Sequence, residues 1–544
     1  MLYPLSYGSR TRSTGPCLSL APRPEHGEPR RAGRRCGTVP EDPAGRPPRR
    51  ALPGARAVVR LMFVDRRVSP RLERLLIVTH MHVAGAIHAD VAAPSPQWLT
   101  EPDDLNALDP ALWSRTVART GEGSLEVGGV DVRTAVEREG SPVYLFDEDD
   151  FRARAREFAR AFTGWDVYYA GKAMLTRTVA RIISEEGLDL DVCSGGELTV
   201  ALAGGMDPAR IGMHGNNKTS EELELALCSG VGRIIVDSLD EIGRIEELCR
   251  EGDWRAKVMV RVTPGVEAHT HEYIATAHED QKFGFSIANG QAMVAMVRCH
   301  YSPCIELLGV HSHIGSQIFD TGGFEIAARR TIKLMGQFAD ATGVHLPQLD
   351  LGGGFGIAYT SADSPATPEH LAAGLREIVE HEANVYSMAV PRMSVEPGRA
   401  IAGPSTMAVY TVGTVKVVDL DGGAQRVYVS VDGGMSDNIR PALYAAEYSG
   451  VLANRASDES GVLCRVVGKH CEGGDILVRD VFLPGDIVPG DLIAVPGMGA
   501  YSREMASNYN HALRPPVVRV SRGALHPMIR RETMDDLMSL DVGD

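Results

Sequence analysis

Between residues 165 and 400 the hydrophobic pattern alternates between two kinds of segment. Short runs rich in β-branched and aromatic residues are followed by a turn and then by a longer segment with helical spacing of its apolar positions. The short runs are DVYYAGKA (166–173), DLDVCS (189–194), RIGMHG (210–215), RIIVDS (233–238), KVMVRVTP (257–264), ELLGVHSHIG (306–315), QLDLGGG (348–354) and RMSVEPGR (392–399). Eight alternations of strand and helix in roughly 250 residues predict a parallel (β/α)8 barrel of the TIM type.

Helical segments are predicted between most of these runs. They cover 175–187, 197–205, 220–230, 239–252, 324–343 and 369–385. Two of them begin with the spacing of a capping box, Thr219 to Glu222 and Ser238 to Glu241, and several end at a glycine.

After residue 403 the pattern changes to strands separated by Gly, Pro and Asp turns, which predicts an all-β domain over 404–544. The strand-like runs are 407–418, 425–431, 462–471, 475–484, 491–499 and 515–523. Short strands near 123–132 are expected to join this domain. The predicted organisation is therefore an N-terminal part (104–147) that joins the β-domain, a barrel (148–403) and a C-terminal β-domain (404–544).

The first 95 residues differ from the rest of the chain. They are rich in Arg and Pro and show little apolar periodicity, so we expect a disordered extension over 1–95, with Met81 as an alternative start. The extension lacks the long apolar run of a secretory signal.

Composition narrows the class of protein. A chain of 544 residues is too long for one ordinary core, and its net charge of −15 argues against a nucleic-acid binder. The sequence contains no run of 18 uninterrupted apolar residues, so it does not indicate a membrane span. The nine cysteines are scattered without a CxxC pair, which is typical of a reducing compartment. We therefore expect a soluble cytoplasmic protein.

Polar residues gather at the carboxyl ends of the predicted barrel strands, where such barrels place their active sites. They are Lys172, Ser194, His214, Asp237, His313, the glycines 352–354, Glu396 and Arg399. The glycine-rich stretch DLGGGFG (350–356) follows the seventh strand, a usual position for a phosphate site.

A lysine, an acid, a histidine and a phosphate cradle at one mouth suit pyridoxal 5′-phosphate. The lysine would form a Schiff base with the cofactor, the acid would face the pyridine nitrogen and the glycines would hold the phosphate. Burial of the lysine at the mouth would lower its pKa. The sequence contains neither a nucleotide P-loop at Gly171–Lys172 nor a dinucleotide-binding GxGxxG unit.

Nine motifs, in order, resemble one family. They are YYAGKA, DVCSGGEL, HGNNK, HSHIGSQ, DLGGGFG, EPGR, VDGGMSDNIRPALY, GKHCEGGD and GAYSREMASNYN. From about residue 104 to the C-terminus the chain resembles diaminopimelate decarboxylase, a fold-type III enzyme that depends on pyridoxal phosphate and has an alanine-racemase-like barrel. The resemblance implies decarboxylation of meso-2,6-diaminopimelate to L-lysine and CO2, the final step of lysine biosynthesis.

The resemblance also implies roles for single residues. Lys172 would carry the cofactor, Glu396 would keep the pyridine nitrogen protonated, His313 would lie on the ring face and Cys471 would donate a proton after CO2 leaves. The other implied cofactor-binding residues are Ser194, His214, Ser316, Gly352, Gly353, Gly354, Pro397, Gly398, Arg399 and Tyr501. His311 is interpreted as structural.

The substrate's far end, which carries a carboxylate and an ammonium group, would need its own partners. The implied substrate-binding residues are Arg399, Arg440, Tyr444, Glu472 and Tyr501. Arg399 would serve either phosphate or substrate. Ornithine decarboxylases have aspartate where this chain has Glu472. Cys471 and Glu472 would enter the partner subunit's site, so the resemblance implies a homodimer with shared active sites. Family members usually have a cysteine where this chain has Ser502.

Three other functions remain open: a decarboxylase for another basic amino acid, a pyridoxal-phosphate carrier without turnover, and an alanine racemase. The first should lack Arg440 and Tyr444, the second should lack the β-domain motif, and HCEGGD and EPGR point away from the third. We predict no metal site at His269, His271 and His278, or within CHYSPC (299–304), because neither spacing matches a known ligand set.

Overall fold

In the computed structural model the described residues are 96, 98–265, 282–419 and 425–543. They belong to a unit that spans Val91–Asp544. The extension predicted over 1–95 lies outside the described residues, and so do the histidines 269, 271 and 278.

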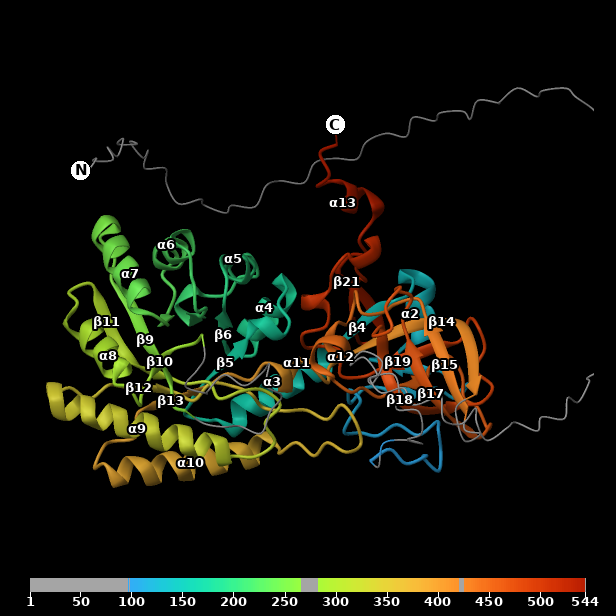
Figure 1. Ribbon diagram of the computed structural model, residues 1–544, viewed down its shortest axis with the longest axis horizontal. Coiled ribbons are helices and arrows are strands. Elements are labelled where there is room, and N and C mark those ends of the chain that lie inside the picture. Colours follow the sequence, from blue (N-terminus) through green and yellow to red (C-terminus); the bar gives the residue numbers. More distant parts are fainter. Residues whose placement is uncertain (1–95, 97, 266–281, 420–424, 544) are drawn as a thin grey trace, which may run out of the picture. The chain divides into compact units, whose positions relative to one another are not determined.

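Eight parallel strands close into a barrel, which confirms the predicted fold (Figure 1). The strands in barrel order are β5 (Asp166–Ala170), β6 (Asp189–Val192), β7 (Ile211–Met213), β8 (Arg233–Val236), β9 (Ala256–Thr263), β11 (Ile305–His311), β12 (Gln348–Asp350) and β13 (Arg392–Val395). The pairing of β13 with β5 closes the ring. A two-residue strand, β10 (Phe285–Ser286), adds to β9.

Helices follow the barrel strands and bury their apolar faces against the sheet. They are α4 (Arg177–Glu185), α5 (Gly195–Ala203), α6 (Ser220–Ser229), α7 (Leu239–Gly252), α8 (Gln291–Tyr301), α9 (Gly322–Thr342), α10 (Pro368–Val385) and the short α11 (Arg399–Ala402), with α3 (Glu148–Ala161) before β5. The sequence pattern did not predict α8. Cys299 and His300, which begin CHYSPC, belong to its last turn, and Cys299 is fully buried.

The two expected capping boxes differ. At α6 the Thr219 side chain accepts from the Glu222 amide and the Glu222 side chain accepts from the Thr219 amide. At α7 the Ser238 side chain caps Glu241, but the Glu241 carboxylate accepts from Asp237 N and from the buried Lys218 Nζ instead. That carboxylate thus joins the loop after β7 to the end of β8.

The second domain is mostly β, as predicted. Its main sheet has the order β18 (Ile476–Pro484), β17 (Gly461–Val467), β15 (Gln425–Val431), β14 (Thr406–Asp419), β4 (Val143–Asp147), β20 (Val517–Ser521) and β21 (Ala524–Ile529). The strands β19 (Leu492–Val495) and β16 (Val451–Leu452) join beside β14. The short α12 (Arg440–Tyr444) follows β15.

The strands near 123–132 form a small sheet of their own. It consists of β1 (Ala118–Arg119), β2 (Leu125–Val127) and β3 (Val130–Asp131), followed by α2 (Val132–Glu139). Leu125 and Val127 nevertheless share a buried core with Met407, Val409 and Leu492 of the β-domain strands.

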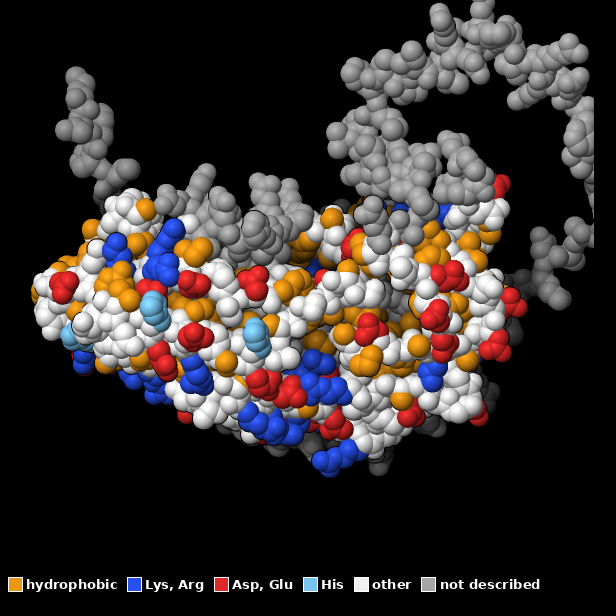
Figure 2. Space-filling model, turned by 90° about the horizontal axis from the view of Figure 1, so that it is seen from below, with side chains coloured by type: hydrophobic (Ala, Val, Ile, Leu, Met, Phe, Trp, Pro, Cys, Tyr) orange, Lys and Arg blue, Asp and Glu red, His pale blue; other side chains and the backbone are white. Residues whose placement is uncertain are grey.

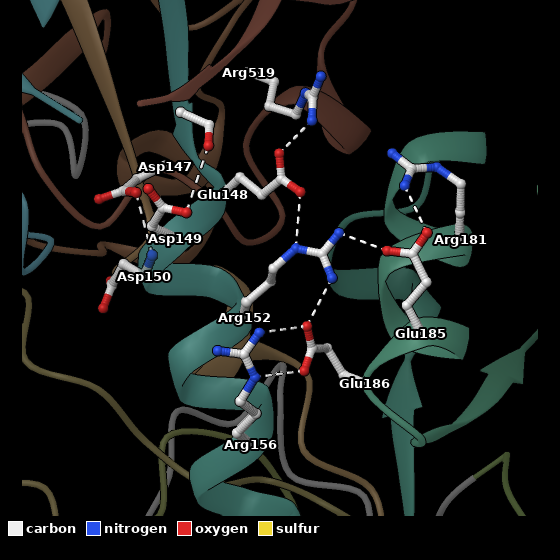
Figure 3. Close-up of polar contacts among 11 residues, drawn as sticks. Asp147, Glu148, Asp149, Asp150, Arg152, Arg156, Arg181, Glu185, Glu186 and Arg519 are labelled. Carbon is white, nitrogen blue, oxygen red and sulfur yellow. Dashed lines mark hydrogen bonds and ion pairs between the residues drawn. The ribbon is translucent and has the colours of Figure 1, made fainter. Parts of the chain in front are cut away.

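A network of arginines and carboxylates connects the barrel to the β-domain (Figure 3). Arg519 of β20 is paired with Glu148 at the start of α3. Glu148 also accepts from Arg152, which in turn reaches Glu185 and Glu186 at the end of α4, each at 2.6 Å. Three elements that are distant in sequence are therefore held by one set of ion pairs.

On the face seen in Figure 2, acidic and basic side chains are interspersed. Within the described ranges, the helices include none that is long and apolar enough to cross a membrane.

Candidate active site

A cavity of about 590 Å³ opens where the barrel mouth meets the β-domain. Ten of the predicted site residues line it: Lys172, His313, Ser316, Gly354, Glu396, Gly398, Arg399, Arg440, Tyr444 and Tyr501. The first seven come from the carboxyl ends of barrel strands and the last three from the β-domain. The cavity therefore combines groups from both domains.

Lys172 lies in a tight turn (Gly171–Ala173) directly after β5. A β-carbon on Gly171 would lie 2.7 Å from the Asp191 carbonyl, so only glycine allows this turn to approach β6. The Tyr501 amide donates to the Ala173 carbonyl at 2.9 Å, which fastens the β-domain to the turn. The Lys172 side chain is exposed to the cavity in this chain, unlike the burial that the sequence suggested.

Glu396 is buried beneath the cavity, with two histidines beside it. Its Oε1 lies 3.0 Å from His311 Nε2 and 3.3 Å from His214 Nε2. Burial and the nearby Asp191 raise the pKa of Glu396, but the two histidines more than offset them, and the pKa is below its ordinary value. Glu396 is therefore a carboxylate. Its two histidine neighbours include His311, which the sequence interpretation treated as structural.

Below Glu396 the barrel interior contains a charged group that the sequence analysis missed. Arg233 Nη2 lies 2.6 Å from Asp350, 3.7 Å from Asp191 and 3.9 Å from Glu396. Burial raises the pKa of Asp191 to about 7. Arg233 is the first residue of its strand, whereas the sequence analysis considered only the residues at the carboxyl ends of the strands. The polar Asp191 within the apolar run DLDV was a usable signal.

The glycine run serves close packing between loops. The Gly353 amide donates to His313 Nδ1 at 3.2 Å. A β-carbon would lie 2.5 Å from the Ser312 carbonyl at Gly352 and 2.1 Å from the Glu396 carbonyl at Gly353. Gly352 also has a φ of +72°. These glycines therefore let the loops after β11, β12 and β13 meet. Burial lowers the pKa of His313 well below its ordinary value, which keeps the imidazole neutral.

Two buried arginines face the cavity without an acidic partner. Arg399 is 7% and Arg440 is 6% exposed. Arg399 donates to the Tyr359 hydroxyl at 2.6 Å and to Ser316 Oγ at 2.9 Å, and Arg440 donates to the Tyr448 hydroxyl. Among the described residues, neither arginine has a carboxylate within ion-pair distance. Such a pair favours an anionic ligand.

The remaining predicted residues do not line the cavity. Ser194 caps α5 by accepting from the Glu197 amide, and His214 lies behind Glu396. Cys471 and Glu472 are exposed on the β-domain, where the Glu472 carboxylate accepts from the Tyr509 hydroxyl. The others outside the lining are Gly352, Gly353 and Pro397.

His214, His311 and Glu396 place three ligand atoms within 4.8 Å of one another, a spacing that also suits a metal ion. The expectation that the protein uses no metal therefore stays a prediction.

Comparisons with known proteins show the family to which the chain belongs. The family model described as "Pyridoxal-dependent decarboxylase, pyridoxal binding domain" matches residues 148–403. Diaminopimelate decarboxylase of Mycobacterium tuberculosis (strain H37Rv) is 51% identical over 445 residues, which cover 81% of this chain and 100% of that protein. The Bacillus subtilis (strain 168) enzyme of the same name is 45% identical over 424 residues, covering 77% and 95%.

A solved structure of diaminopimelate decarboxylase from M. jannaschii in complex with L-lysine has a TM-score of 0.73 and 29% identity, covering 80% of this chain and 99% of that one. The fold, the cavity and the full-length match to the curated relatives agree. This chain therefore belongs to the diaminopimelate decarboxylase family of pyridoxal-dependent decarboxylases.

Proposed function

We propose that this protein uses pyridoxal 5′-phosphate to decarboxylate meso-2,6-diaminopimelate to L-lysine and CO2. Family membership supports the reaction. The observation that carries the proposal is the arrangement of the cavity, in which Lys172 and Glu396 come from the barrel and the unpaired Arg440 comes from the β-domain. The barrel side of the cavity suits the reacting end of the substrate, and the β-domain side suits the carboxylate at its far end.

The residues present fit the cofactor. Glu396 lines the cavity as a carboxylate, so it can face a protonated ring nitrogen there. Lys172 offers a primary amine in the same cavity, and the neutral His313 lines it as well. Bound pyridoxal phosphate supplies an electron sink for the electron pair that remains when CO2 leaves. In this proposal Glu396 keeps the proton on the ring nitrogen, which maintains that sink.

The phosphate would lie at the loops after β11, β12 and β13. Ser316, Gly354 and Arg399 line the cavity there, and Arg399 brings a positive charge. A β-carbon on Gly354 would lie 2.6 Å from the Gly315 carbonyl, so glycine is needed for the two loops to meet at this side of the cavity. Tyr501 completes this side from the β-domain.

Arg440 and Tyr444 would bind the far carboxylate of the substrate. An arginine fork matches carboxylate geometry, and Arg440 is already held by the Tyr448 hydroxyl. Because Arg440 has no acidic partner in the described residues, the substrate's carboxylate would compensate its charge. A substrate with only an amine at that end would leave the charge unpaired.

We further propose a homodimer with shared sites. Cys471 and Glu472 do not line the cavity of their own chain, and both are exposed. In a dimer Glu472 would meet the far ammonium group in the partner's cavity, and the Cys471 thiol would donate a proton to the carbon that has lost CO2. Mixing Lys172→Ala and Cys471→Ala chains tests this: shared sites predict recovered activity, and sites within one chain predict none.

An absorbance scan followed by CO2 release with meso-diaminopimelate, L-lysine and L-ornithine tests the function. We expect a lysine-bound cofactor band that Lys172→Ala abolishes, and CO2 from diaminopimelate only. Lys257→Ala is the matched control, because Lys257 is an exposed lysine on another barrel strand, β9, and does not line the cavity.

Other outcomes point to the other functions. CO2 mainly from lysine or ornithine would keep the cofactor chemistry but contradict the role of Arg440. A band without CO2 from dimeric protein would favour a cofactor carrier. No band after addition of pyridoxal phosphate would contradict the role of Lys172.

A further inference from the structure

Tyr359 lies between the two unpaired arginines, in a loop after β12 that no motif singled out. It is 6% exposed and lines the cavity. Its hydroxyl accepts from Arg399 Nη1 at 2.6 Å, and Arg440 lies over its ring with Cζ 4.8 Å from the centroid. One side chain therefore contacts an arginine from the barrel and an arginine from the β-domain.

The surroundings of Tyr359 fix its position. Its amide donates to Asp363 Oδ2 at 2.9 Å, and its carbonyl accepts from Ser449 Oγ at 3.0 Å. The ring packs edge-on against Tyr448 at 5.0 Å between centroids. Gly497, with a φ of +72°, leaves room for the ring, since a β-carbon there would lie 3.1 Å from it. The tyrosine is thus held from both domains.

We propose that Tyr359 is a positioning residue that fixes Arg399 and Arg440 relative to each other. It thereby sets the spacing at which the cavity accepts two anionic groups, the cofactor phosphate near Ser316 and the substrate carboxylate near Arg440. This inference rests on the proposed function and deepens it, because it gives the site a measure of substrate length. A diamino acid is selected when its far carboxylate reaches Arg440 while its near end reaches Lys172.

Charge supports the same role. Burial raises the pKa of the Tyr359 phenol, but Arg399 and Arg440 lower it more, so that it is below its ordinary value. The other titratable groups facing it are Tyr448 and Asp363. Loss of the phenol proton would neutralise one of the two arginine charges and weaken binding of an anion. The wild-type KM should therefore rise on the alkaline side.

Tyr359→Phe keeps the ring under Arg440 and removes the acceptor for Arg399. Loss of one hydrogen bond to a charged group predicts a KM for meso-diaminopimelate that rises about tenfold, with kcat changed less than about threefold. The alkaline rise in KM should disappear. Calorimetric binding should show that the preference for L-lysine over cadaverine, which has no carboxylate, falls by a similar factor.

Tyr410→Phe is the control for loss of a buried hydroxyl, because Tyr410 donates to Asp437 at 2.9 Å and does not line the cavity. It should lower the melting temperature without changing KM or the ligand preference. Equal effects of both variants would overturn the proposal, as would a Tyr359→Phe enzyme with the wild-type KM, alkaline limb and ligand preference. A wild-type protein that does not decarboxylate diaminopimelate would contradict the proposed function instead, and the binding preference would still test Tyr359.

Discussion

Two groups of arginines in this protein have opposite surroundings. In the network that connects α3, α4 and β20, Arg152 alone contacts three carboxylates, and Arg519 shares one of them (Figure 3). In the cavity, the side chains of Arg399 and Arg440 donate hydrogen bonds only to hydroxyl groups, although they are more deeply buried. A buried charge is costly unless it is paired. The network arginines are paired with carboxylates of the same chain, whereas the cavity arginines need an anionic ligand as their partner.

The comparison predicts that the cavity arginines govern binding and the network arginines govern stability. Arg440→Met should have the largest effect on function, raising KM for meso-diaminopimelate roughly 100-fold, since a buried charged hydrogen-bond pair contributes about 3 kcal/mol. Its unfolding free energy should not fall, because an unpaired buried charge has been removed. Steady-state kinetics and thermal unfolding check both statements, and a less stable variant with unchanged KM would reverse the assignment.

Arg152→Met should have the converse effect. It leaves Glu148 and Glu186, both 8% exposed, without one of their partners, and the expected loss is about 2 kcal/mol of unfolding free energy. KM for the substrate should stay within about twofold of wild type, which is smaller than the effect of one lost hydrogen bond. Urea unfolding and kinetics on the same preparation measure both, and a large rise in KM would show that the network also shapes the cavity.

The stability deficit of Arg152→Met should depend on pH. Burial raises the pKa of Glu148, but Arg152 and Arg519 lower it more, and it lies below its ordinary value. A carboxyl with a depressed pKa stabilises the fold fully above its unfolded pKa of about 4.3, and this stabilisation is lost as the pH falls through the lower folded pKa. The difference in unfolding free energy between wild type and variant should therefore shrink below about pH 4. A constant difference would mean that packing, not charge, causes the loss.

The smallest effect is expected at the edge of the network. Arg181 pairs with Glu185 one helical turn away, and both side chains are nearly half exposed. Such surface pairs contribute about 0.3–0.5 kcal/mol, so Arg181→Met should barely change the melting temperature. Raising the salt concentration should remove what difference there is.

The sequence predicted the barrel well because strand and helix periods alternate clearly and the strand ends carry polar residues. It missed α8, which follows the segment whose histidines 269, 271 and 278 were considered as metal ligands. It interpreted His311 as structural, although positions 311 and 313 lie two apart and so share one side of an extended chain. In the structure His311 contacts Glu396 at 3.0 Å.

Other parts of the site could not be predicted from sequence. Tyr359 and Arg440 are 81 positions apart in the printed chain, and only the docking of the β-domain onto the barrel brings them together. The pairing of Arg233 with Asp350 likewise depends on which barrel strands face each other. Periodicity reports which side of an element is buried, not which side chains meet across the core.

The unpaired charge of Arg440 should select a substrate with a far carboxylate. The most direct test is the ratio of kcat/KM for meso-diaminopimelate to that for D- or L-lysine, whose far end has only an amine, in wild type and in Arg440→Met. The ratio should be large in wild type and should fall roughly 100-fold in the variant. A ratio that is unchanged by the substitution would contradict it.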